Sequence, residues 1–182
     1  MNSEPQKPNS HAPPGWSYNP SSWSERVPLM LVGFAGFCIA SYLAAYQWRI
    51  INSVWEPFFG LGSKTVLNSP ISTLLPIPDA AVGALGYIAD VVTGAIGGTT
   101  RWKTMPWIVL CFGFAVGPLG LTSILLVILQ PVKYEAWCTL CLASATISVL
   151  MIGSAMDEVL ASLQYLRNLR GKSLWKAFWG LK

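Results

Sequence analysis

The 182-residue chain is 53% hydrophobic and only 11% charged, whereas a typical soluble chain carries about 25% charged residues. So few charges cannot cover a globular surface in water, which excludes an ordinary soluble domain and favours an all-α integral membrane protein. The formal net charge is +4, and its basic residues gather behind the last apolar segment, where attraction to anionic lipid is a simpler explanation than nucleic-acid binding.

Residues 1–26 form a polar segment rich in Pro, Ser and Asn. This segment lacks the charged start and short apolar core of a cleavable signal, so we expect a flexible N-terminal tail. His11, the only histidine, lies in it, which removes histidine-based catalysis from consideration.

Four apolar segments approach or exceed the roughly 20 residues that a helix needs to cross a bilayer. Loops and isolated strands cannot satisfy their backbone hydrogen bonds in lipid, so each segment is predicted to be a helix. Glycines within them allow close backbone packing, which predicts a compact four-helix membrane domain over residues 27–156. The predicted spans cover residues 27–48, 80–97, 104–131 and 137–156.

The charges of the loops predict the orientation. Residues 97–103, between the second and third spans, carry two cations and no anion, and the segment after the fourth span is also basic. By the positive-inside tendency, both termini and this loop face the cytoplasm. The long loop after the first span and the start of the fourth span then face outward.

Residues 157–182 form a basic amphipathic tail, with leucines at positions 160, 163, 166 and 169. Trp175, Phe178 and Trp179 follow beside two lysines. One interpretation is a helix that lies on the inner leaflet. The other, for the first half, is a plain extension of the fourth span into the cytoplasm.

Cys138 and Cys141 form a Cys-x-x-Cys motif at the start of the fourth span. Cysteines three apart on a helix share a face, and the positive end of the helix dipole stabilises a thiolate there, which favours an exchangeable disulfide. The alternatives are half a zinc site, a static disulfide and inert packing. No further Cys or His lies in a predicted outer loop, so no metal site is expected. A disulfide across two residues stabilises little, and redox exchange is therefore the favoured interpretation.

Three other residues inside the spans carry reactive groups. Cys38 and Cys111 fall near the middle of the first and third spans, where a free cysteine usually behaves as a small apolar residue. Asp90 is costly to bury as an ion. We expect it to form a helix–helix hydrogen bond or to lie close enough to the surface to be hydrated.

The loop over residues 54–70 is apolar and aromatic, with Trp55, Phe58 and Phe59 near its start. An ordinary solvated loop is polar. The pattern indicates either a lid over the outer mouth of the bundle or a simple interfacial segment anchored by these three side chains.

These features in this order resemble the vitamin K epoxide reductase family, including its bacterial homologues. The resemblance covers roughly residues 30–156. It rests on four spans, the long outer loop and the Cys-x-x-Cys that opens the fourth span. It also rests on the Val66–Ser69 stretch and on the Asp79–Tyr87 stretch at the start of the second span.

The resemblance implies a bundle around a quinone, either ubiquinone or menaquinone. It places Cys141 beside the quinone and Cys138 toward the incoming electrons. Asp79 stands where the family has an asparagine that hydrogen-bonds a quinone oxygen. The residues implied in quinone binding are Asp79, Ser69, Gly83, Ala145, Trp55, Phe58 and Phe59.

The sequence departs from the family pattern in two places. The family's second cysteine pair, in the long loop, is replaced by Trp55 and Ser63. A tyrosine expected one helical turn after the second cysteine is Ala145 here. The internal relay from loop to active site therefore cannot operate.

Two functions follow. The first is a quinone-linked thiol–disulfide oxidoreductase of the bacterial inner membrane, reduced by an external thioredoxin-like dithiol protein. The alternative is a non-catalytic subunit that binds quinone or lipid within a larger membrane complex. In both, the expected partners include membrane lipid and exclude nucleic acid.

Overall fold

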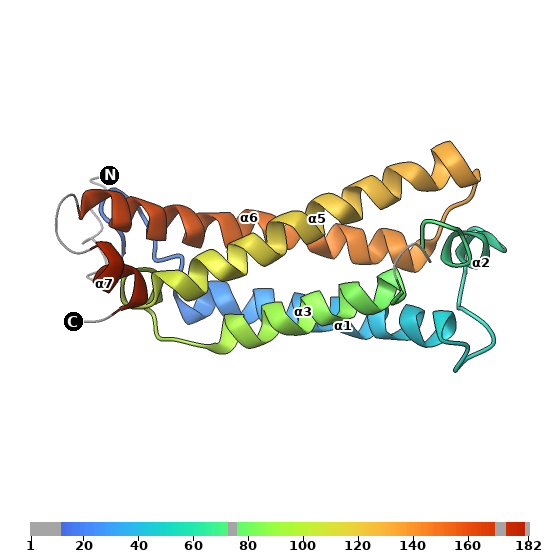
Figure 1. Ribbon diagram of the computed structural model, residues 1–182, viewed down its shortest axis with the longest axis horizontal. Helices are drawn as coiled ribbons and strands as arrows, with labels where there is room; N and C mark the ends of the chain where they lie inside the picture. The colour runs from blue at the N-terminus through green and yellow to red at the C-terminus, as the bar shows by residue number, and fades with distance from the viewer. Residues whose placement is uncertain (1–11, 73–75, 170–173, 181–182) are drawn as a thin grey trace, which may run out of the picture.

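The structure is a computed structural model that describes residues 12–72, 76–169 and 174–180. Four long helices run side by side along the long axis (Figure 1). They are α1 (Trp23–Gln47), α3 (Asp79–Ala95), α5 (Pro106–Tyr134) and α6 (Thr139–Asn168). Three short helices are α2 (Gly62–Leu67), α4 (Arg101–Thr104) and α7 (Leu174–Trp179). These described ranges contain no strand, which confirms the predicted all-α class.

The four long helices close a ring, because α1 and α5 each contact both α3 and α6. All four helices contribute to one core near the middle of the bundle. Its buried members are Ala40, Ala84, Tyr87, Phe112, Val116, Met151 and Ala155. We call the end that carries α2 the loop end, and the opposite end, which carries α4 and α7, the terminal end (Figure 1).

Three helices, α1, α5 and α6, are long and apolar enough to cross a membrane. Only 28%, 17% and 22% of their most apolar windows is buried within the protein. Large apolar side chains therefore face outward, among them Leu31, Phe114 and Leu121. So large an exposed apolar surface belongs in lipid, which confirms that this is a membrane protein. The remaining predicted span coincides with α3, which has 17 residues.

Gly36 sets the distance between α1 and α3. A Cβ added at Gly36 would lie 2.6 Å from the ring of Tyr87 on α3. That ring is fixed from its other end, because the Tyr87 hydroxyl donates to the Ser144 carbonyl at 2.6 Å and lies 2.7 Å from Ser148 Oγ. The glycine thus lets Tyr87 reach across the bundle to α6.

A buried ionic network closes the terminal end. Arg101 of α4 and Glu158 of α6 form a two-point salt bridge, with side chains only 1% and 3% exposed. Arg26 Nε also donates to the Gly94 carbonyl at 2.9 Å, and Arg101 Nη1 donates to the Thr93 carbonyl at 2.7 Å. The last carbonyls of a helix lack intrahelical donors, so the two arginines satisfy the end of α3 and complement its dipole.

The predicted tails meet the bundle at the same end. In the N-terminal one, Trp16 Nε1 donates to Gln164 Oε1 at 2.9 Å and the Tyr18 hydroxyl donates to Asp157 Oδ2 at 2.5 Å. Residues 12–22 therefore lie against α6. In the C-terminal one, α6 continues unbroken to Asn168 and α7 follows as a separate short helix. The rest of both tails lies outside the described residues.

Candidate functional site

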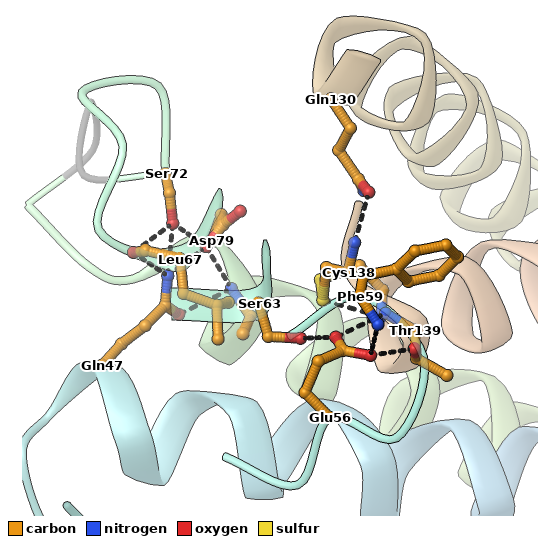
Figure 2. The surroundings of a disulfide bond; sticks show 12 residues. Gln47, Glu56, Phe59, Ser63, Leu67, Ser72, Asp79, Gln130, Cys138 and Thr139 are labelled. Atoms are coloured by element: carbon orange, nitrogen blue, oxygen red, sulfur yellow. Dashed lines mark hydrogen bonds between the residues drawn. A yellow bond between two sulfur atoms is a disulfide. The ribbon is translucent and has the colours of Figure 1, made fainter. Parts of the chain in front are cut away.

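The Cys-x-x-Cys lies at the N-terminus of α6, where a disulfide joins Cys138 to Cys141 (Figure 2). Cys138 is the N-cap residue, and its sulfur accepts a hydrogen bond from the Cys141 amide at 3.1 Å. The Cys138 amide donates to Gln130 Oε1 of α5 at 3.0 Å. Cys138 is 0% exposed, whereas Cys141 is partly exposed. Helices α5 and α6 together thus hold the pair with Cys138 fully covered.

A cavity of about 100 Å³ lies beside Cys141 among the four long helices. Asp79, Gly83 and Ala145 also line it. Ser69 lines an adjoining cavity of about 50 Å³, together with Asp79 and Cys141. The structure therefore brings four of the residues implied in quinone binding to the cysteine that was expected to adjoin the quinone.

Asp79 is fixed at this cavity by neighbours that the sequence did not reveal. Its Oδ1 accepts hydrogen bonds from Gln47 Nε2 at 2.6 Å, Ser72 Oγ at 2.8 Å and the Ala80 amide at 2.8 Å (Figure 2). These three contacts on one oxygen fix the orientation of the carboxyl group at the edge of the cavity. Gln47 lies 32 residues before Asp79, so no local pattern could have indicated this contact.

A third cavity, of about 130 Å³, shares Asp79 and Gly83 with the first and extends along α3. Tyr87, Ser148 and Asp90 line its far part. Asp90 is 6% exposed, and its Oδ1 has no hydrogen-bond partner among the described residues. The helix–helix hydrogen bond that was one expectation for Asp90 is therefore not formed by this oxygen among the described residues, and Asp90 lies at a cavity.

The aromatic side chains of the long loop (residues 54–70) lie elsewhere. Trp55, Phe58 and Phe59 are 62%, 75% and 41% exposed. The Phe59 ring lies 6.3 Å from the ring of Trp137, just before the first cysteine. These three side chains cover the outside of the loop end and do not line the two cavities beside Cys141.

Glu56 fastens this loop to α6. Its carboxylate accepts hydrogen bonds from the Thr139 amide at 3.0 Å, from the Thr139 hydroxyl and from the Ser63 hydroxyl (Figure 2). The Phe58 and Phe59 amides add weaker contacts at 3.4 and 3.3 Å. Burial acts to raise the pKa of Glu56. The hydrogen bonds from Ser63, Thr139 and the loop backbone outweigh it and lower the pKa to about 2.

The loop packs closely where it meets the disulfide. Ser63, which the resemblance places at a loop-cysteine position, is 1% exposed. At the neighbouring Gly62 an added Cβ would collide with the Trp137 carbonyl oxygen, so only glycine permits this approach. The loop thus covers Cys138 without a covalent bond to it.

The other two cysteines lie outside the site. Cys38 and Cys111 are free and exposed on α1 and α5. Within the described part of the chain, no three His, Cys, Asp or Glu side chains are grouped so that they could hold a metal ion.

Comparison with the curated proteins gives no match. Among protein families, the sequence model of the vitamin K epoxide reductase family matches residues 27–156. This segment runs from the start of α1 into α6 and includes both cysteines of the disulfide. It covers most of the chain, and the chain therefore belongs to the vitamin K epoxide reductase family.

Proposed function

We propose that the protein is a quinone-linked thiol–disulfide oxidoreductase, in which an external dithiol protein reduces the Cys138–Cys141 disulfide and the reduced pair then reduces a membrane quinone. The family as a whole supports this class of reaction. One observation carries the proposal for this chain: Cys141 lines the cavity that Asp79, Gly83 and Ala145 also line.

The cavities suit a quinone, which is a flat apolar ring with two carbonyl oxygens. Apolar side chains such as Leu126 line all three of them. Polar groups also line the cavity along α3, among them Tyr87, Ser148 and Asp90, whose carboxyl oxygen Oδ1 has no partner among the described residues. When bound, a quinone supplies the acceptor for two electrons and two protons. The residues that would hold it are Asp79, Ser69, Gly83 and Ala145, with Trp55, Phe58 and Phe59 as the lid above.

In this proposal, the sulfur of Cys138 is the atom that the external dithiol attacks. A thiolate of the dithiol attacks Cys138, the Cys138–Cys141 bond breaks, and Cys141 leaves as a thiolate beside the cavity. The second thiol of the donor then displaces Cys138 from the mixed disulfide, so the donor is oxidised and the pair holds two electrons. Because Cys138 is 0% exposed, the long loop must move before this attack.

The membrane placement extends the same proposal. Helix α3 has 17 residues, about 25 Å at 1.5 Å per residue, and lies at the short end of the range of about 17–25 residues for a transmembrane helix. With α3 as the fourth span, both termini lie on one side. We place the terminal end in the cytoplasm and the loop end outside the bacterial inner membrane, where oxidised cysteines persist.

Quinone reduction by the purified protein in detergent, with a small dithiol as donor, tests the proposal. We expect turnover in the native protein and its loss in Cys138→Ser and in Cys141→Ser. Cys111→Ser is the matched control, because this free cysteine lies away from the site, and its turnover should equal the native rate. Equal turnover in all four proteins would exclude the Cys-x-x-Cys as the electron carrier.

A second function is favoured by the complete burial of Cys138 and by Trp55 and Ser63 at the loop-cysteine positions. It is a non-catalytic subunit that binds quinone or lipid in a larger membrane complex. Quinone binding without turnover, together with a partner that co-purifies equally with native and Cys138→Ser protein, would support this alternative over the enzyme.

A further inference from the structure

A carboxylate lies at the N-terminus of the helix that carries the disulfide. Glu56 Oε2 accepts the Thr139 amide at 3.0 Å, and Glu56 Oε1 accepts the Thr139 hydroxyl. Thr139 is the first residue of α6 and directly follows Cys138. Glu56 therefore accepts the hydrogen bond of one of the free N–H groups that would otherwise stabilise a cysteine thiolate (Figure 2).

An unopposed helix N-terminus makes a Cys-x-x-Cys pair oxidising. The free N–H groups and the dipole stabilise the thiolate, which lowers the cysteine pKa and favours the reduced form of the pair. A fixed negative charge at the same place acts in the opposite direction, because it repels the thiolate. With Glu56 ionised, less of the dipole's stabilisation reaches the cysteines.

Glu56 cannot swing away while the loop is closed. The Ser63 hydroxyl donates to it from α2, and Ser63 itself is 1% exposed. The other charged groups near the pair are held differently. Glu135 and Lys133 are exposed at the turn between α5 and α6, and Asp79 is hydrogen-bonded across the cavity.

We infer that Glu56 is a positioning residue that makes the Cys138–Cys141 pair more strongly reducing, and so favours electron flow from the pair to its acceptor. The equilibrium concerned is exchange with an external dithiol: disulfide plus donor dithiol gives reduced pair plus donor disulfide, with two electrons and two protons transferred. The charge of Glu56 shifts this equilibrium toward the disulfide. Only the direction of physiological flow rests on the proposed function.

The test is the redox equilibrium of the full chain in detergent against dithiothreitol buffers, without quinone. Each protein carries Cys38→Ser and Cys111→Ser, so that alkylation after acid quenching counts only the thiols of the pair. Glu56→Gln keeps the shape and a hydrogen-bond acceptor but removes the charge. We expect a tenfold shift of its equilibrium toward the reduced pair, equivalent to about 30 mV.

Two further variants separate charge from loop closure. Glu135→Gln removes a nearby exposed charge and should leave the equilibrium unchanged. Glu56→Asp keeps the charge on a shorter side chain and should stay close to the native value. The inference is overturned if Glu56→Gln shows no shift or a shift toward the disulfide, or if Glu56→Asp behaves like Glu56→Gln. A native protein that shows these shifts but never reduces quinone would refute the proposed function and leave this inference standing.

Discussion

The carboxylate of Glu56 connects the start of the long loop, α2 and the N-terminus of α6 through hydrogen bonds from Phe58, Ser63 and Thr139. Each donor favours the ionised acid, so these contacts become weaker once Glu56 is protonated. A loop that is otherwise exposed at its aromatic side chains thus depends on a single charge for its contact with α6.

The acid response of this contact follows from the pKa of Glu56, which is lowered from 4.5 to about 2. A lowered pKa means that the stabilisation is fully present above about pH 4.5 and is lost as the pH falls toward about 2. We expect native protein with its disulfide intact to unfold at a higher temperature than Glu56→Gln from neutral pH to about pH 5, and the difference to shrink below it. A difference that is unchanged at about pH 3 would contradict this account.

A second single-residue prediction concerns the buried salt bridge at the terminal end. Glu158→Gln leaves the Arg101 guanidinium, 1% exposed, without its counter-charge. Breaking a buried pair in this way costs about 3–5 kcal/mol. In detergent, the unfolding temperature should fall strongly for Glu158→Gln. It should hardly change for Glu25→Gln, whose carboxylate is exposed on α1. If the unfolding temperature of Glu158→Gln fell no further than that of Glu25→Gln, the Arg101–Glu158 salt bridge would not stabilise the fold.

Among the elements, α1 and α3 are the pair whose packing depends most visibly on one small residue. The Tyr87 side chain passes over Gly36 and ends at Ser144 and Ser148 on α6. Helices in lipid lack a hydrophobic drive to associate and rely on such close contact. The third cavity, of about 130 Å³, has Tyr87 in its lining, so helix packing and the shape of the site are linked.

Gly36→Ala tests this link. The added methyl group must displace a tyrosine that is hydrogen-bonded at its far end, and overpacking of this kind costs about 1–3 kcal/mol. We expect a lower unfolding temperature for Gly36→Ala. The control is Gly153→Ala in α6, where an added Cβ has no neighbour within 4 Å. Equal unfolding temperatures for the two variants would mean that α1 and α3 can move apart to accept the methyl group without loss of stability.

For the whole molecule, the membrane character and the all-α class could be predicted because they depend on composition and on long charge-free segments. The Cys-x-x-Cys could be placed at a helix start for the same local reason. Contacts between distant segments could not be predicted. The sequence indicates Arg101 only as a cation of a loop, yet its side chain is buried against Glu158, 57 residues later. Glu56 carried no signal for its contact with Thr139, 83 residues away.

The placement of the molecule across the membrane gives a prediction at this largest scale. Ser53, in the connection after α1, and Gly98, between α3 and α4, are both exposed. In cells whose protein carries Cys38→Ser and Cys111→Ser, an impermeant maleimide should label Ser53→Cys and not Gly98→Cys. Permeabilised cells should label both. The reverse pattern in intact cells would invert the proposed orientation.

The most direct test of the central claim is a single turnover. Purified protein is reduced at Cys138 and Cys141, freed of excess dithiol, and mixed with a quinone without oxygen. The account predicts that each protein forms one quinol while the two thiols of the pair become a disulfide, and that Cys141→Ser forms none. Quinol formation without loss of those thiols, or no quinol from a protein that binds the quinone, would contradict it.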